Sequence, residues 1–138
     1  MSDVFRNGLL DGKSAFITGG GSGINLAIAE KLATQGARVA ILGRKQEKLD
    51  TAVKQISSHG GRAISFPADV RDYAAVSDAL KKVHEQHGPI DILVCGAAGN
   101  FPARALDMSA NGFKAVIDID LLGTFNTCRA AHEYLRRP

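Results

Sequence analysis

The sequence predicts an α/β fold in which a parallel sheet is covered by helices on both faces. Short, almost continuous apolar runs alternate with segments whose apolar residues recur every three or four positions. Continuous apolar runs are typical of parallel strands that are buried on both faces. A glycine-rich turn joins the first run directly to the first helical segment. Together these observations predict the order βαβαβαβα.

Each element can be assigned in chain order. The four predicted strands span residues 15–17, 39–42, 63–66 and 90–95. The helical stripes that follow them are Ile24, Ala27, Ile28 and Leu32; Leu49, Ala52, Val53 and Ile56; Val76, Ala79, Leu80 and Val83; and Phe113, Val116, Ile117, Leu121, Thr124, Cys128 and Leu135. The first three helices end at Gly36, at His59-Gly60-Gly61 and near Gly88-Pro89. Right-handed crossovers then favour a doubly wound sheet of the Rossmann type, with residues 1–138 belonging to one domain.

The composition is that of an ordinary globular domain. Of 138 residues, 45% are hydrophobic and 22% are charged, and the net charge of +3 comes from scattered lysines and arginines. Scattered positive charge disfavours nucleic acid as a partner, and no apolar stretch has the length of a membrane span. His84 and His87 lie one helical turn apart without a third ligand, so no metal site is expected.

The cellular location is expected to be cytoplasmic. The two cysteines form no close-spaced motif, and the first six residues do not resemble a secretion signal. A peroxisomal location would require a C-terminal signal that is not present in this sequence.

The turn Thr18-Gly19-Gly20-Gly21-Ser22-Gly23-Ile24 is the strongest functional signal. Glycine permits a tight turn and lets backbone amides approach a phosphate without an intervening Cβ. The N-terminus of the next helix adds unpaired amide donors and a partial positive charge. Because the turn follows a strand and opens a helix, we expect Gly19, Ser22, Gly23 and Ile24 to bind a dinucleotide. A purely structural glycine-rich turn is the alternative.

The residues after the second strand indicate the kind of dinucleotide. A carboxylate at this point holds the ribose 2′-hydroxyl of NAD, but here Gly43 is followed by Arg44 and Lys45. A planar guanidinium binds a phosphate with two parallel hydrogen bonds, whereas a carboxylate would repel it. We therefore expect NADP(H), with Arg44 and Lys45 at its 2′-phosphate. The alternative is that both cations are solvated at the start of a helix.

The pattern Thr-Gly-x-x-x-Gly-Ile resembles the cofactor turn of the short-chain dehydrogenase/reductase family. This resemblance implies that Asp69 and Val70, after the third strand, contact the adenine. It also implies that Ala97 and Gly99, after the fourth strand, pass beside the ribose and nicotinamide. From the residues alone, Asp69 could equally cap the next helix, by itself or with Asp72.

Three positions depart from the pattern of that family. Asn25 stands where the family usually has a third glycine, which lets the helix pack closely on the strand. Asn25 therefore either pushes the helix outward or extends its amide to a phosphate. Cys95 and Gly96 stand where the family usually has two asparagines, which weakens the local hydrogen-bond network. We interpret Cys95 as a small buried hydrophobic residue and not as a nucleophile.

The run Ala97-Ala98-Gly99-Asn100-Phe101 is similar to the 2,4-dienoyl-CoA reductases of this family, particularly those of the peroxisomal type. Other segments resemble the same branch: residues 16–24, 69–71, 118–120 and 123–126. The resemblance implies an NADPH-dependent oxidoreductase that reduces an unsaturated acyl-CoA. The alternatives are reduction of a 3-oxoacyl or other carbonyl compound, and a non-catalytic nucleotide-binding fragment.

The same resemblance implies that four residues border the acyl-CoA substrate, namely Arg71, Phe101, Ser109 and Asn111. Local structural roles are the alternative. Arg71 could be a solvated helix start, Phe101 a loop anchor and Ser109 the N-cap of the last helix.

The catalytic serine of the family, and the tyrosine and lysine of its Tyr-x-x-x-Lys motif, are expected beyond Pro138. Neither Tyr73 nor Tyr134 has a lysine four residues later. Asp120 matches the position of an asparagine that supports the proton relay of the family, although the same role does not follow for an aspartate. The long last helix of the family commonly packs against a second subunit, which implies a homo-oligomer.

Overall fold

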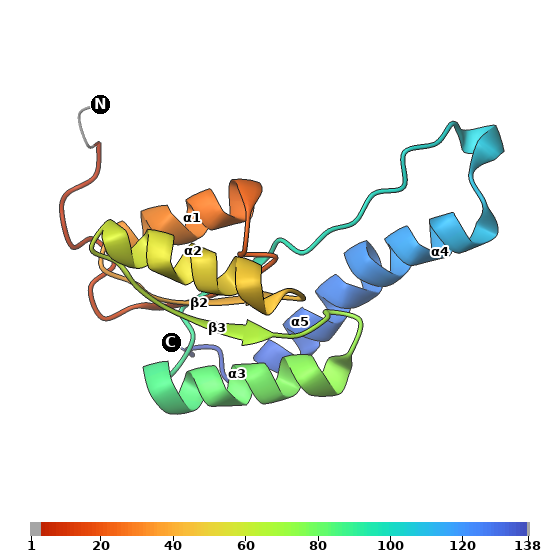
Figure 1. Cartoon of the computed structure of the whole chain (residues 1–138). Helices are drawn as coiled ribbons and strands as arrows, with labels where there is room; N and C mark the ends of the chain where they lie inside the picture. Colours follow the sequence, from red (N-terminus) through yellow and green to blue (C-terminus); the bar gives the residue numbers. More distant parts are fainter. Residues whose placement is uncertain (1–3, 138) are drawn as a thin grey trace.

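The structure, a computed structural model, describes residues 4–137 and confirms the α/β architecture (Figure 1). Within these residues the sheet contains four parallel strands: β1 (Ser14–Thr18), β2 (Arg38–Gly43), β3 (Arg62–Pro67) and β4 (Ile92–Cys95). They lie in the order β3-β2-β1-β4. The chain winds outward from β1 to β3 and then returns to the other side of β1. The reversal creates a switch point between β1 and β4, where open α/β sheets bind ligands.

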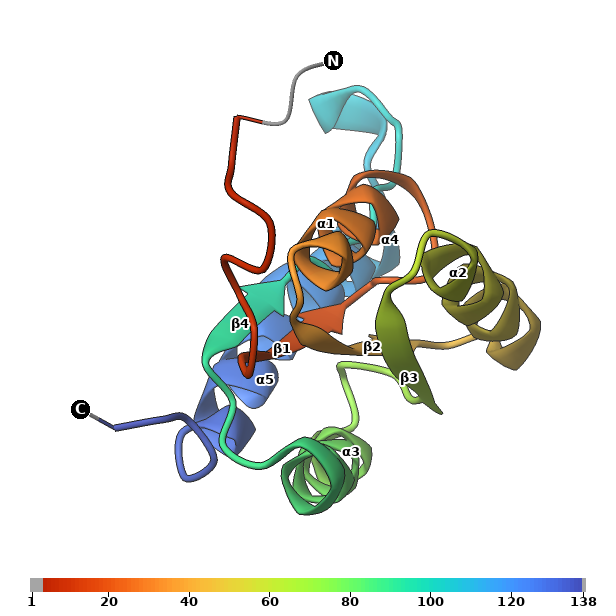
Figure 2. The same ribbon diagram turned by 90° about the vertical axis from the view of Figure 1, so that its left-hand side faces the viewer.

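Two layers of helices cover the sheet (Figure 2). The helices are α1 (Gly23–Thr34), α2 (Gln46–Ser58), α3 (Tyr73–His87), the short η1 (Ala105–Asp107), α4 (Ala110–Ile117), the π-helical η2 (Asp118–Leu122) and α5 (Gly123–Ala131). Buried side chains of α1 and α2 pack on one face of the sheet, and those of α3 and α5 pack on the other. The doubly wound arrangement that the sequence predicts is therefore confirmed.

The central strand β1 shows why the strands read as continuous apolar runs. Successive side chains of a strand point to opposite faces. Phe16 accordingly packs in the layer of α3 and α5, and Ile17 packs in the layer of α1 and α2. Both are fully buried, since each face of the strand meets helices.

The last predicted helix differs from the structure in its bounds and in its regularity. Helical backbone begins at Ala110, passes through η2 and ends at Ala131, so Leu135 lies outside it. The amides of Tyr134 and Leu135 both donate to the Ala131 carbonyl, and Leu135 then forms an isolated parallel bridge with Ile90. Leu135 is an apolar residue at helical spacing, which is why the sequence predicts it in the helix. Its backbone instead pairs with the segment before β4. Ile90 is likewise outside β4, and the predicted strand 90–95 is two residues too long at its start.

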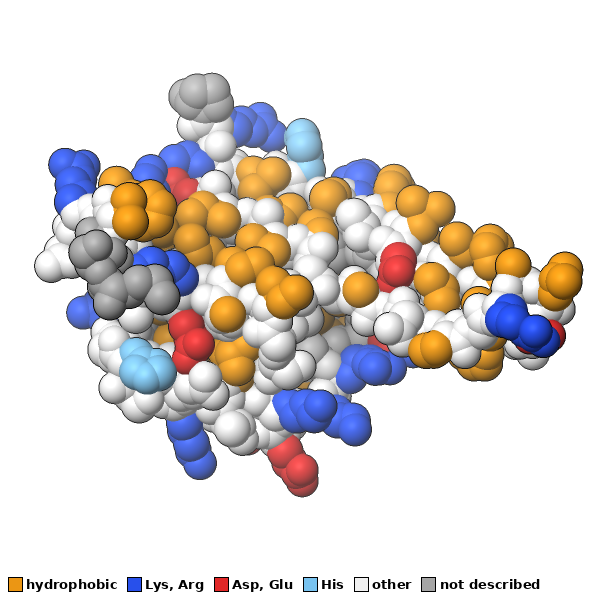
Figure 3. Space-filling model, turned by 90° about the horizontal axis from the view of Figure 1, so that it is seen from above, with side chains coloured by type: hydrophobic (Ala, Val, Ile, Leu, Met, Phe, Trp, Pro, Cys, Tyr) orange, Lys and Arg blue, Asp and Glu red, His pale blue; other side chains and the backbone are white. Residues whose placement is uncertain are grey.

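Helix α4 and the loop before it project away from the sheet (Figure 1). Apolar side chains lie along this arm in the space-filling view (Figure 3). The large exposed hydrophobic residues from η1 to α5 include Leu106, Phe113, Leu121, Leu122 and Phe125. No helix within residues 4–137 is long and apolar enough to cross a membrane.

Asp91 ties together three segments at the end of the sheet opposite the switch point. Its carboxylate accepts hydrogen bonds from the Ser14 amide at 2.9 Å, from Lys13 Nζ at 3.2 Å and from Arg136 Nε at 2.5 Å. The side chain is only 8% exposed. Burial raises the pKa of Asp91, but the bonds from Arg136, Ser14 and Lys13 outweigh burial and lower it overall. The ionised carboxylate thus stabilises the junction of β1, β4 and the C-terminal segment.

We predict that Asp91→Asn lowers the free energy of unfolding of the full gene product by about 1–2 kcal/mol at pH 7, because a buried acceptor of three donors loses its charge. Urea unfolding is the measurement. Since the pKa of Asp91 is lowered on folding, its contribution is present at neutral pH and is lost as pH falls through that lowered pKa.

The matched control is Asp78→Asn, which removes the same charge from an exposed pair with Lys82 on α3. Its expected effect is below about 0.5 kcal/mol. Equal losses for the two variants at pH 7 would show that the Asp91 junction contributes no more than a surface ion pair.

Candidate dinucleotide site

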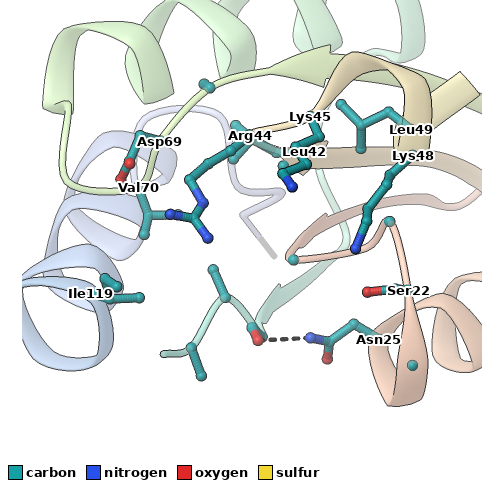
Figure 4. Close-up of a pocket in the computed structure, with 18 of the residues that line it drawn as sticks. Ser22, Asn25, Leu42, Arg44, Lys45, Lys48, Leu49, Asp69, Val70 and Ile119 are labelled. Atoms are coloured by element: carbon teal, nitrogen blue, oxygen red, sulfur yellow. Dashed lines mark hydrogen bonds between the residues drawn. The ribbon is translucent and has the colours of Figure 1, made fainter. Parts of the chain in front are cut away.

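A cleft of about 790 Å³ lies at the carboxyl ends of the strands, over the switch point (Figure 4). The glycine turn, the start of α2, the loop after β3 and the loop after β4 all border it. Its lining includes Gly19, Ser22, Gly23, Ile24, Arg44, Lys45, Asp69, Val70 and Ala97. These are the residues that the sequence assigns to a dinucleotide, except that Gly99 does not line the cleft.

The glycine turn leaves the first turn of α1 open toward the cleft. Gly19 and Gly23 have φ values of 71° and 61°, a backbone conformation that favours glycine. The Gly19 amide donates to the Leu42 carbonyl at 2.7 Å, which fixes the turn against β2. Ser22 is the N-cap of α1, but its side chain makes no capping hydrogen bond. The amide groups that open α1 are therefore free of a side-chain cap and can bind an anion.

The loop after β4 lies directly against this turn. A Cβ on Gly19 would lie 2.9 Å from Ala97 Cα, so only glycine allows the approach. The Ala97 amide also donates to Thr18 Oγ1 at 3.1 Å. Two segments that the sequence assigns to dinucleotide binding are thus in contact at the switch point.

Asn25 has a protein partner that neither sequence-based alternative includes. Its side-chain Nδ2 donates to the Gly96 carbonyl oxygen at 2.7 Å (Figure 4). Asn25 therefore joins the first turn of α1 to the loop after β4. Asn25, which stands where the family usually has a third glycine, thus contacts Gly96, which stands where the family usually has an asparagine.

Three cations border the cleft from the end of β2 and the start of α2. Arg44 and Lys45 were expected there, and Lys48 joins them from one helical turn further on. In Figure 4 the Arg44 guanidinium and the Lys48 ammonium group both project into the cleft. Within residues 4–137, the Arg44 side chain forms no hydrogen bond or ion pair, so its donors are available to a ligand. Lys48 lies in the first turn of α2, three residues after Lys45, and this short separation along the chain is the signal that could have identified it.

Asp69 lines the cleft, but Arg71 holds its carboxylate in a fork. Arg71 Nε and Nη2 donate to the two oxygens at 2.9 and 2.6 Å. The side-chain hydrogen bond from Arg71 is the main cause that lowers the pKa of Asp69. Asp69 does not cap α3. The capping oxygen belongs to Asp72, which accepts from the Ala75 amide at 3.1 Å.

The four residues assigned to the acyl-CoA substrate do not line this cleft. Arg71 pairs with Asp69, and Ser109 caps α4 by accepting from the Gly112 amide at 3.0 Å. The ring of Phe101 packs so close to Gly112 that a Cβ there would lie 2.9 Å from it. Asn111 is exposed at the start of α4. Their assignment to a substrate stays a prediction.

Two polar residues of the last helical segment hold the loops that border the cleft. Asp120, in η2, accepts a hydrogen bond from the Gly99 amide at 2.8 Å. Asn126, buried in α5, donates to the Val70 carbonyl at 2.9 Å. Sequence reasoning did not assign Asn126 a role, because its burial, which calls for an internal hydrogen bond, becomes visible only in the structure. The structure thus places Asp120 as a support for the loop after β4.

The thiol groups of Cys95 and Cys128 lie 3.6 Å apart, between β4 and α5. Burial, together with the neighbouring Cys128, raises the pKa of Cys95 to about 12. The thiol is therefore protonated at neutral pH, but Cys95 is only half-buried, whereas the sequence predicts a buried residue.

The described residues offer no proton donor of the expected kind in the cleft. Tyr73 lies on α3 and Tyr134 follows α5, and neither borders the cleft. Residues 4–137 also contain no cluster of three or more His, Cys, Asp or Glu side chains that could hold a metal ion. What the cleft can do with its own residues is bind and orient an anionic ligand.

Comparison with known proteins agrees with this fold. The family model described as short chain dehydrogenase matches residues 13–138. The chain is 44% identical, over 99% of its length, to the peroxisomal 2,4-dienoyl-CoA reductase of Arabidopsis thaliana. It is 46% identical, over 86% of its length, to the 3-dehydrosphinganine reductase TSC10A of the same plant. The chain belongs to the short-chain dehydrogenase family.

A solved structure supports the same conclusion. The chain superposes on a citronellol catabolism dehydrogenase of Pseudomonas aeruginosa with a TM-score of 0.90 at 35% identity, covering 98% of this chain and 55% of that one. The chain spans 46% and 36% of the lengths of the two plant relatives. It therefore corresponds to less than half of the curated relatives that it matches.

We predict that Asp120→Ala accelerates hydrogen exchange of the Gly99 amide about tenfold, because the amide loses its acceptor. Asp120→Asn retains a side-chain oxygen in the same position and should leave the exchange rate near that of the wild type. Exchange measured at residue resolution by NMR is the test. Fast exchange in both variants would mean that the contact depends on the charge, and slow exchange in both would mean that Asp120 does not hold the loop.

Proposed function

We propose that this chain is the NADP(H)-binding part of an NADPH-dependent oxidoreductase that reduces an unsaturated acyl-CoA of the 2,4-dienoyl type. The observation that supports NADP(H) most strongly is the set of three cations, Arg44, Lys45 and Lys48, at a position where a carboxylate would select NAD. A 2′-phosphate carries the negative charge that these cations would neutralise. The proposal extends the family assignment to one cofactor and one substrate class.

In this proposal each border of the cleft has a separate task. The open first turn of α1 and the glycine turn bind the pyrophosphate. Arg44 binds the 2′-phosphate with its planar fork, assisted by Lys45 and Lys48. The loop of Asp69 and Val70 borders the adenine, and the Asp69 carboxylate is held in place by its pair with Arg71.

The bound dinucleotide would supply a hydride to the substrate. The residues of this chain bind and orient the dinucleotide. The loop after β4, held by Asp120, passes beside the nicotinamide half. Among residues 4–137 no tyrosine borders the cleft, so the proposal assigns proton donation to none of the described residues.

The substrate class is supported by the run from Ala97 to Phe101 and by the similarity to the plant 2,4-dienoyl-CoA reductase. A carbonyl reductase is the second candidate, because the chain is 46% identical to a 3-dehydrosphinganine reductase. We expect the full gene product to turn over a 2,4-dienoyl-CoA with NADPH faster than a 3-oxoacyl-CoA or 3-dehydrosphinganine. Steady-state kcat/KM for each substrate is the measurement.

A higher kcat/KM for either carbonyl substrate would favour the second candidate, a carbonyl reductase. Binding of NADPH without turnover of any substrate would support a non-catalytic nucleotide-binding protein instead.

Cofactor selectivity is tested at Arg44. We predict that Arg44→Ala raises the KM for NADPH about 10- to 100-fold, because a charge-assisted bidentate contact to the 2′-phosphate is lost. The KM for NADH, which has no such phosphate, should change less than about threefold by the same reasoning. Lys54→Ala, an exposed cation on α2 away from the cleft, is the matched control. Equal effects on the two cofactors would argue against NADP(H).

Self-association is part of the same proposal. The exposed apolar side chains of Phe113, Leu121 and Phe125 run along one helical segment, and a second copy is the partner we expect there. The sedimentation mass of the full gene product checks this expectation. The cytoplasmic location expected from the sequence stays a prediction, because the plant dienoyl-CoA reductase is named as peroxisomal.

A further inference from the structure

The Asn25 side chain lies where a side chain of residue 96 would lie. An ideal Cβ on Gly96 would lie 2.2 Å from Oδ1, 2.5 Å from Cγ and 2.6 Å from Nδ2 of Asn25. The Asn25 amide therefore fills the position in which any side chain of residue 96 would begin. A side chain at position 96 would therefore displace the Asn25 amide from its present position.

The contact also includes the backbone of the glycine turn. Asn25 Nδ2 donates to the Gly96 carbonyl at 2.7 Å, and a Cβ on Gly19 would lie 3.0 Å from the same nitrogen. One side chain thus touches the glycine turn and the loop after β4 while standing in the first turn of α1. Gly19, Asn25, Gly96 and Ala97 all line the cleft.

Positions 25 and 96 both depart from the family pattern, and this contact shows that the two departures compensate each other. A side chain is absent from the β4 loop at Gly96, and a side chain is added from α1 at Asn25. The added group has the size and polarity to close the gap, because its amide donates to the backbone of the loop it faces. Two unrelated losses would leave the Gly96 carbonyl unpaired, whereas here it accepts from Asn25.

We propose that Asn25 and Gly96 form a reciprocal positioning pair, which sets the separation between the glycine turn and the loop after β4 and so the width of the dinucleotide cleft. This inference rests on the proposed nucleotide-binding role of the cleft. Asn25 acts through the backbone segments that it joins, and it is a positioning residue. The pair predicts that substitutions at the two positions interact strongly and are not additive.

The test compares Asn25→Ala, Gly96→Ala and the double variant with the wild type, all in the full gene product. Alanine at position 25 removes only the amide and keeps the helix. The dissociation constant for NADPH, from the change in its fluorescence on binding, measures the effect of each substitution on the cleft. The thermal midpoint without nucleotide reports the fold.

Gly96→Ala should raise the dissociation constant for NADPH about tenfold or more, because its Cβ displaces the Asn25 amide. Asn25→Ala should raise it about fivefold, through loss of one hydrogen bond. In the double variant the alanine methyl group enters the space left by the amide. Its dissociation constant should therefore be lower than that of Gly96→Ala alone and within about threefold of Asn25→Ala.

Several results would overturn the pair. Multiplicative effects of the two substitutions, or a shift in thermal midpoint with no change in NADPH affinity, would show that the contact does not position the cleft. If Gly96→Ala fails to fold, a folded double variant supports the pair and an unfolded one overturns it. Failure of the wild type to bind NADPH would instead overturn the proposed function, on which the pair depends.

Discussion

The close approach of two backbone segments at the switch point governs the rest of this structure. Gly19 and the Ala97 backbone lie so near each other that a single Cβ would collide. Because β1 and β4 are adjacent in the sheet, the turn after one and the loop after the other must meet there. Their contact brings the open end of α1 beside the loop, and every border of the cleft is placed relative to this point.

The fold and most of the cleft follow from local patterns, because each depends on residues close together in the sequence. The glycine turn, Arg44 with Lys45, and the four apolar runs are signals of this kind. Asn25 is not, since its partner Gly96 is 71 residues away. Lys48 resembles any exposed helix lysine until α2 is placed beside the cleft. The π-helical η2 does not change the spacing of the apolar residues, so the sequence does not predict it. The end of α5 depends on the pairing of Leu135 with Ile90, which is distant in the sequence.

Within residues 4–137 the cleft combines an uncapped helix end with three cations. No tyrosine of the described residues borders it. Support for the cleft comes from inside the chain, through Asp120, Asn126 and the fork between Asp69 and Arg71. These contacts hold the loops in place.

The central claim is that the cleft recognises the phosphate that distinguishes NADP(H) from NAD(H). Calorimetric titration of the full gene product with 2′-phospho-ADP-ribose and with ADP-ribose tests it most directly, because neither ligand contains nicotinamide and neither can react. Tighter binding of the 2′-phosphorylated ligand, by about tenfold or more, is the predicted result. Equal affinity, or tighter binding of ADP-ribose, would contradict it.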